Sequence, residues 1–495
     1  MDNKKHSSKT ISSLKWNLLE QVFSQGITLI LGITLMRLLK PEQFGLLGMV
    51  TVFSGFLNVF SDFGLSSSLI QKQDIHELDK STIFWTSCTI GVILAAILFF
   101  SSGYLGDFYN EPGLKAIAKV QSASFIITSL ATVHISLLRK TLSYKKIVLI
   151  SILASTISAA VAMVMAFNNY GVWAIVAQQL LNALLLTIFF WMAISFKPTI
   201  TFSGTRLKNH LKFGLPLFGS GTFSYWIGNG DNLLIGKFLG ANALGLYSRA
   251  YTLVTLPTHR ISVMITSVMF PSFALIKDDY AKVKRIFLKM SRVLASLILP
   301  MMGILFIGAK SIVLLLVGNK WIDIVPIIQV LTGVASIKAL SILNSSILVS
   351  HGRTDLDFKI NVVSGLLLLL CFFLGVQFGI LQVAIAYLVG VVLISIPGWY
   401  IISKIISCSL KEFVANILPQ ILVTLFLVFT GALTFRFFFG NLPDAVKILL
   451  IVLQFGLGWI ILFSIFFKSR LQELIAIVVE LKTGEIIKIN KVNNP

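Results

Sequence analysis

The sequence predicts an all-α polytopic membrane protein with about fourteen transmembrane helices, arranged as two pseudo-symmetric six-helix lobes followed by two C-terminal helices. Three observations support this fold class. Apolar runs of about 20 residues recur along the whole chain. The 495 residues are 56% hydrophobic and only 12% charged, whereas soluble domains are roughly a quarter charged. A short junction near the first apolar run is also repeated about 200 residues later.

Each apolar run is long enough to cross a hydrocarbon core of roughly 30 Å as a helix. Between consecutive runs, short polar or charged connections mark the expected turns. The expected spans lie near residues 16–36, 44–65, 83–103, 116–138, 147–167, 171–194, 214–236, 246–268, 293–317, 325–349, 360–378, 380–403, 414–436 and 445–467.

The distribution of lysine and arginine predicts the orientation. Basic residues gather at the start of the chain and in alternate connections, such as residues 139–146 and 277–292. Short basic segments stay in the cytoplasm, so both termini are expected there. The formal net charge of +21 then faces anionic lipid headgroups, and we expect no nucleic acid as a partner.

The repeated junction indicates an internal duplication. LMRLLKPEQFGLLGM begins at Leu35 and IGKFLGANALGLYSR at Ile235, so that Gly45 corresponds to Gly245. Two six-helix copies share one orientation, and their interface can form a central cavity that opens alternately to each side. The expected divisions are an N-lobe at 1–205, a C-lobe at 206–405, two helices at 406–468 and a cytoplasmic tail at 469–495.

The sequence contains no motif for catalysis. The expected outer connections are short, and no nucleotide-binding loop, HExxH motif or His/Cys cluster occurs. The three cysteines are scattered singly and predict no disulfide framework. We therefore expect no catalytic residues, no metal and no cofactor, and leave open coupling to a proton or sodium gradient.

Several stretches resemble a known family. They are DNLLIGKFLGANALGLYSRA from Asp231, YGVWAIVAQ from Tyr170, DFGLSSSLIQ from Asp62 and FPSF from Phe270. The chain is similar to the polysaccharide transporter family of the multidrug/oligosaccharidyl-lipid/polysaccharide flippase superfamily, in particular to its colanic acid and teichuronic acid exporters.

The resemblance implies a flippase in the bacterial cell (inner) membrane, built like the multidrug exporters of that superfamily. Its substrate would be an undecaprenyl-pyrophosphate-linked oligosaccharide, moved from the inner to the outer leaflet for cell-surface polysaccharide synthesis, beside membrane lipids and polymerase or glycosyltransferase partners. Three alternatives stay open: a multidrug or cation exporter, a lipid II flippase, and a membrane glycosyltransferase or polymerase.

Four basic residues lie within apolar spans, where an ionisable group costs about 2.5 to 3.5 kcal/mol on insertion scales. They are candidates for a cationic cavity that binds pyrophosphate or acidic sugars. The alternatives are that Lys310 snorkels to an interface, that these cations pair with carboxylates on other helices and, for Arg249, that it forms an ion pair with Asp231. The four are Lys338, Arg260, Lys310 and Arg249.

Polar stripes on the predicted helices are candidates for a cavity lining that binds sugars. Their alternative role is to hold helices together through hydrogen bonds. The candidates are Asn17, Gln21, Ser24 and Thr28 in the first span, with Asn58, Gln178, Ser220 and Ser224 elsewhere.

Three carboxylates are candidates for ion coupling or gating, since burial raises a carboxyl pKa enough for proton uptake. They are Glu20, Asp62 and Asp231. Their alternatives are an interfacial position for Glu20, an ion pair with a basic loop for Asp62, and the pair with Arg249 for Asp231.

Overall fold

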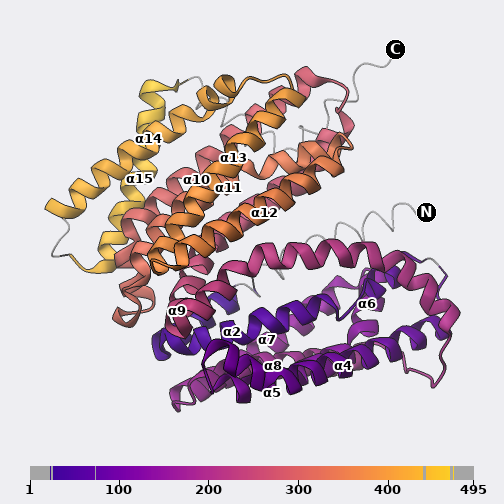
Figure 1. Ribbon diagram of the computed structural model, residues 1–495. Coiled ribbons are helices and arrows are strands. Elements are labelled where there is room, and N and C mark those ends of the chain that lie inside the picture. The colour runs from indigo at the N-terminus through magenta and orange to yellow at the C-terminus, as the bar shows by residue number, and fades with distance from the viewer. Residues whose placement is uncertain (1–22, 24–25, 73, 439–441, 469–471, 473–495) are drawn as a thin grey trace. The chain divides into compact units, whose positions relative to one another are not determined.

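The computed structural model describes residues 23, 26–72, 74–438, 442–468 and 472, and among these it contains helices and no β-strand (Figure 1). The predicted all-α fold is confirmed for this part of the chain. The helices are Gly26–Leu38, α2 (Pro41–Val59), α3 (Leu65–Gln71), α4 (Glu77–Tyr109), α5 (Leu114–Ser129), α6 (Thr132–Lys140), α7 (Tyr144–Phe167), α8 (Val172–Ala193), α9 (Gly204–Leu275), α10 (Tyr280–Leu316), η1 (Asn319–Trp321), α11 (Ile324–Ser350), α12 (Thr354–Val376), α13 (Ile380–Ile405), α14 (Leu410–Phe437) and α15 (Asp444–Phe466).

Nine of the described helices are long and apolar enough to cross a membrane, namely α4, α7, α8 and α10 to α15. A tenth candidate is the pair α5 and α6, which is bent by 43° between Ser129 and Thr132. The single span predicted at 116–138 therefore corresponds to two helices. The chain is a multi-pass membrane protein.

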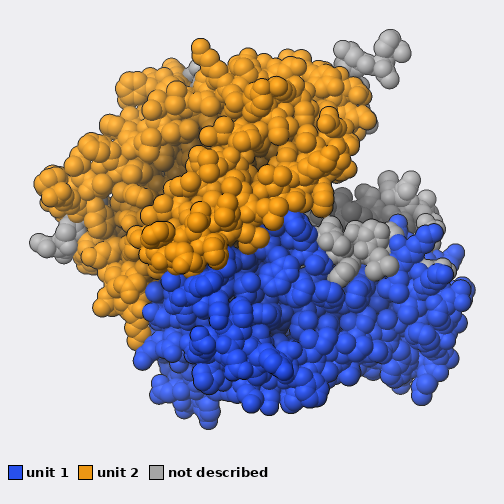
Figure 2. Space-filling view, viewed as in Figure 1, with its two compact units in different colours: residues 1–246 blue, residues 247–495 orange. Residues whose placement is uncertain are grey.

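The chain divides into two compact units, residues 1–246 and 247–495 (Figure 2). In unit 1, α4 packs against α5, α7 against α8, and α5 against α8. In unit 2, α11 packs against α10 and α13, while α10 also contacts both α14 and α15. Each unit therefore has its own bundle of helices.

Helix α9 contains a break that separates two predicted spans. It runs from Gly204 to Leu275, but Gly240 has φ 83° and ψ −179°, which is not helical. Only glycine adopts this backbone region readily. The expected spans 214–236 and 246–268 lie on either side of it.

The repeated junction forms a reciprocal contact within unit 1. A Cβ atom on Gly45 would lie 1.7 Å from the carbonyl oxygen of Ala241, and one on Gly245 would lie 1.9 Å from that of Pro41. Because Ala241 and Gly245 stand at the same offset from Pro41 and Gly45, each copy of the junction makes the same contact with the other. Only glycine permits so close a backbone approach.

Candidate functional site

A cavity of about 170 Å³ lies within unit 2, between the second half of α9 and α11. Its walls are partly apolar, with Val254, Leu331 and Val334 among the lining residues. Its polar lining consists of Tyr251, Thr255, Thr258, His259, Ser262 and Lys338. One of the four predicted cationic residues is thus placed in a cavity.

Lys338 is the lysine among the described residues that line this cavity. Its side chain is exposed, although its neighbours Ala335 and Ala339 are buried. Its Nζ donates a hydrogen bond to the Tyr387 hydroxyl at 2.9 Å and lies 5.5 Å from the centre of that ring. Within the described residues, no carboxylate forms an ion pair with Lys338.

Aromatic rings hold the partner of Lys338 in place. Tyr387 on α13 is buried, with 4% of its surface exposed. Its ring stacks on Tyr251 of α9 at 6.5 Å and meets Phe372 of α12 edge-on at 5.1 Å. Such aromatic pairs have preferred geometries, so the hydroxyl of Tyr387 is directed by neighbours on two other helices.

Hydroxyl groups continue from the lysine along both helices. On α9, Thr258 and Ser262 are buried and line the cavity. On α11, Ser341 lies one turn after Lys338 and its Oγ donates to Ser395 Oγ at 3.2 Å. An ammonium group beside several hydroxyls can bind an anionic group together with sugar hydroxyls.

Of the other predicted cations, Lys310 and Arg249 have described side chains, and neither lines the cavity. Lys310 is exposed near the end of α10. Arg249 is half-buried on α9, two residues before Tyr251. Arg260 follows His259 on α9, but its side chain lies outside the described residues. The predicted pair between Arg249 and Asp231 stays a prediction.

The polar stripes are described only in part. Asn17, Glu20, Gln21 and Ser24 lie outside the described residues, as does the side chain of Ser220.

Among the polar candidates that are described, local contacts dominate. Asn58 Oδ1 accepts a hydrogen bond from Ser61 Oγ at 2.9 Å. Gln178 is half-buried, whereas Thr28 and Ser224 are exposed. Asp231 is buried, and its Oδ1 accepts from the backbone N–H of Asn232 at 2.7 Å. Their predicted role as a cavity lining stays a prediction.

Asp62 lies at the start of a short helix. Its Oδ1 accepts hydrogen bonds from the backbone N–H of Ser66 at 3.0 Å and from Ser66 Oγ at 2.6 Å. A carboxylate that accepts from the first turn of a helix stabilises that helix. Asp62 therefore has a local structural role at α3, in addition to the predicted role in ion coupling.

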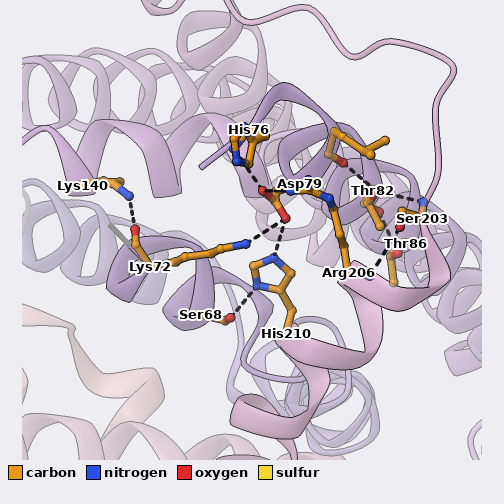
Figure 3. A network of polar contacts seen from close by, with 11 residues as sticks. Ser68, Lys72, His76, Asp79, Thr82, Thr86, Lys140, Ser203, Arg206 and His210 are labelled. Atoms are coloured by element: carbon orange, nitrogen blue, oxygen red, sulfur yellow. Dashed lines mark hydrogen bonds and ion pairs between the residues drawn. The ribbon is translucent and has the colours of Figure 1, made fainter. Parts of the chain in front are cut away.

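A second charged cluster, which the sequence did not predict, lies in unit 1 around Asp79 (Figure 3). Asp79 is 0% exposed in the first turn of α4. Its carboxylate meets Arg206 NH1 at 2.6 Å, Lys72 Nζ at 3.1 Å and His210 Nε2 at 3.4 Å. Four segments meet here, since Lys140 also donates to the backbone carbonyl of Lys72.

The environment of Asp79 keeps it ionised. Asp79 precedes the apolar stretch 83–103, so it lies outside the predicted membrane span. Burial by itself would raise its pKa above the usual 3.8, but the His76 backbone N–H and the side chains of Lys72 and His210 lower that pKa to about 2. A carboxylate with this pKa does not take up a proton near neutral pH.

The Asp79 cluster fixes the connection between α8 and α9. Ser68 Oγ lies 2.6 Å from His210 Nδ1, and the Ser203 backbone N–H donates to Thr82 Oγ1 at 3.2 Å. The one sequence signal is the spacing of His76 and Asp79, since an acid three residues after a helix cap accepts from that cap. We infer that the role of the Asp79 cluster is structural, namely to hold α9 against α3 and α4.

The fold is one already seen in a solved membrane-protein structure. The structure is similar to that of the lipid II flippase MurJ in an inward closed conformation, with a TM-score of 0.75 at 15% sequence identity, covering 93% of this chain and 100% of that one. At this identity the likeness concerns the fold alone.

Sequence comparison then gives the family. Residues 34–326 match the family described as polysaccharide biosynthesis protein, and the chain belongs to this family. The lipopolysaccharide biosynthesis protein WzxC of Escherichia coli K12 is 28% identical over 413 residues, covering 83% of this chain and 84% of the relative. The teichuronic acid biosynthesis protein TuaB of Bacillus subtilis 168 is 30% identical over 374 residues, covering 74% and 77%. The resemblance seen in the sequence is confirmed.

Proposed function

We propose that this protein is a flippase that moves undecaprenyl-pyrophosphate-linked oligosaccharides from the inner to the outer leaflet by alternating access. The observation that carries the proposal is Lys338, a lysine within a membrane helix that faces a cavity and forms no ion pair with a carboxylate of the described residues. The comparisons support the cargo class, because the family is described as polysaccharide biosynthesis protein and the two relatives are named for lipopolysaccharide and teichuronic acid biosynthesis.

The chemistry of the cargo fits this lysine. A pyrophosphate crossing the bilayer needs a positive partner, because an uncompensated charge in hydrocarbon is costly. A lysine ammonium has three donors, and Lys338 gives one of them to Tyr387. Its other two donors have no hydrogen-bond acceptor among the described residues and can bind an anion, and the hydroxyls of Thr258 and Ser262 line the same cavity.

The finer topology belongs to the same proposal. We propose fourteen spans in a bacterial inner membrane, with both termini in the cytoplasm. The N-lobe would comprise residues 1–205 and the C-lobe 206–405, followed by two helices at 406–468 and a cytoplasmic tail at 469–495. Polymerase or glycosyltransferase machinery would take the product. Proton or sodium coupling through Glu20, Asp62 or Asp231 stays part of the proposal, as do substrate contacts by Arg249, Arg260 and Lys310.

The three alternative functions differ from the proposed one in binding residues, product or cargo. A cation exporter of the same superfamily would use carboxylates to bind its cargo, whereas the described residues that line the cavity include a lysine and a histidine and no acid. A glycosyltransferase or polymerase would release a product from lipid-linked sugar. A lipid II flippase differs by cargo alone, so a competition between the two lipids separates it from the proposal.

Transbilayer movement of a defined lipid tests the proposal. The purified protein would be placed in liposomes with a fluorescent undecaprenyl-pyrophosphate oligosaccharide, under an imposed proton or sodium gradient. We expect wild-type protein to move the lipid, and Lys338→Ala to slow it by roughly tenfold to a hundredfold, as expected when a hydrogen bond to a charged group is lost.

Lys404→Ala is the matched control. Lys404 also lies on a membrane helix beside a tyrosine, with Nζ 4.6 Å from the Tyr400 ring, but it does not line the cavity. We expect this variant to flip lipid at the wild-type rate. Movement no faster than in empty liposomes would overturn the proposal, and equal rates for all three proteins would remove Lys338 from the path.

A further inference from the structure

We propose that Tyr387 is a positioning residue for the substrate, acting through Lys338: its hydroxyl holds the lysine ammonium at the cavity while leaving the positive charge intact. This inference rests on the proposed function, because it concerns how the same cavity binds an anion. It assigns a role to a residue that does not line the cavity itself.

The position of Tyr387 is determined by its surroundings. Its side chain is almost fully buried, and its ring contacts Tyr251 of α9 and Phe372 of α12. Lys338 reaches it from α11 with an N–O distance of 2.9 Å. Neighbours on α9 and α12 therefore fix the ring of Tyr387 on α13, and its hydroxyl oxygen holds the end of a long, flexible lysine on α11.

The Tyr387 hydroxyl is a neutral acceptor, so it binds the Lys338 ammonium without cancelling its positive charge, whereas a carboxylate would cancel it. An aspartate or glutamate in place of the phenol would form an ion pair with Lys338 and cancel most of its attraction for an anion. The phenol accepts a hydrogen bond from the ammonium without adding negative charge. The lysine is thus oriented and still cationic, as an anion-binding group must be.

The flanks of Lys338 explain why an anchor is needed. Two alanines close to Lys338 on α11 are small and line the cavity: Ala335, one turn before it, and Ala339, the next residue. Short side chains leave the four-carbon stem of a lysine with several rotamers, and ordering such a stem has an entropic cost. Tyr387 removes part of that freedom before the substrate arrives, which improves binding by preorganisation.

Tyr387→Phe tests this role, because it removes the hydroxyl and keeps the ring between Tyr251 and Phe372. We expect the KM for the fluorescent undecaprenyl-pyrophosphate oligosaccharide to rise about tenfold, with kcat within about twofold of wild type and the unfolding midpoint nearly unchanged. Tyr400→Phe is the matched control on α13, since Tyr400 is 48% exposed, and its KM should equal that of wild type.

A double-mutant cycle distinguishes positioning from packing. If Tyr387 acts through Lys338, the substitution Tyr387→Phe has no further effect on KM in a Lys338→Ala background. Additive effects would show an independent structural role and overturn the inference. An unchanged KM for Tyr387→Phe alone would overturn it while the proposed function stands, and a wild-type protein that moves no lipid would overturn both.

Discussion

Asp79 in unit 1 and Lys338 in unit 2 are two charged side chains in one apolar chain, with opposite surroundings. Asp79 is fully buried and meets Arg206, Lys72 and His210 within 3.4 Å. Lys338 is exposed towards a cavity and donates to the neutral hydroxyl of Tyr387. The carboxylate has an excess of opposite charge, while the lysine has a neutral partner.

The difference separates a charge that stabilises the fold from a charge that serves a ligand. Burial of an unpaired charge is costly, so a charge that belongs to the fold has its partners built in. A charge that binds a ligand must leave its counter-charge to the ligand. The comparison predicts that substitutions at Asp79 change stability, and that substitutions around Lys338 change transport.

The largest effect is expected for Asp79→Ala, which leaves three basic side chains next to one another without their acceptor. Removing one partner of a buried ion pair costs about 3 to 5 kcal/mol. We expect the lower end, about 3 kcal/mol, because the side chains of Lys72 and Arg206 are 41% and 31% exposed. Denaturant unfolding in detergent micelles would measure this loss.

Glu77→Ala is the control in the same turn of α4. Glu77 pairs with Lys80, but its side chain is 69% exposed, so the cost should stay below about 1 kcal/mol. Equal losses for the two variants would contradict the assignment of Asp79 as the structural charge.

Acid should weaken the Asp79 cluster in a defined pH window. Because the pKa of Asp79 is lowered in the folded protein from 3.8 to about 2, its ionisation stabilises the fold fully above about pH 4. That contribution is lost as the pH falls through about 2, and amounts to about 2 kcal/mol. The stability difference between wild type and Asp79→Asn should shrink over this window, and a difference that grows on acidification would refute the prediction.

A carboxylate placed beside Lys338 should give this lysine a partner of opposite charge, as Asp79 has in unit 1. Ser341 lies at i+3 from Lys338 on α11, where side chains of opposite charge can pair. We expect Ser341→Asp to slow lipid flipping about tenfold, equivalent to about 1.4 kcal/mol, because the new charge neutralises the lysine. Ser341→Asn has nearly the same shape without the charge, and should flip at close to the wild-type rate. Similar slowing by both variants would point to packing.

The smallest effect concerns the outer part of the Asp79 cluster. Ser68→Ala removes the 2.6 Å hydrogen bond to His210, and a single buried hydrogen bond contributes about 1 kcal/mol. The variant should lose about that much stability and keep the wild-type flipping rate. Slower flipping with unchanged stability would show that the Asp79 cluster serves transport and does not stabilise the fold.

The sequence predicted Lys338 and missed the residues around Asp79 for one physical reason. A lysine in the middle of an apolar run is costly whatever surrounds it, so its position alone marks it. Asp79 lies next to polar residues at a helix start, and its partners Arg206 and His210 are 127 and 131 residues away. Nothing local distinguishes such an acid. Tyr387, 49 residues from Lys338, was missed for the same reason.

The sequence predicted the membrane helices, but it did not predict where those helices bend or break. Long apolar runs such as those of α7 and α13 predict membrane helices directly. The bend between α5 and α6 depends on tertiary packing, since the run at 116–138 contains no proline or glycine. Gly240 was visible in the sequence, but only its positive φ shows that it interrupts α9.

The reciprocal contact of Gly45 with Ala241 and of Gly245 with Pro41 has the form of an interface between identical subunits, where the same residue appears on both sides. If the two copies arose by the duplication that the sequence predicts, a shorter ancestor with one copy of this junction would have made the contact by pairing with itself. One change at its glycine would then have broken both contacts at once. In a single chain the two glycines can change independently, yet a Cβ atom on either would lie only 1.7 or 1.9 Å from a carbonyl oxygen, which leaves no room for a side chain on either one.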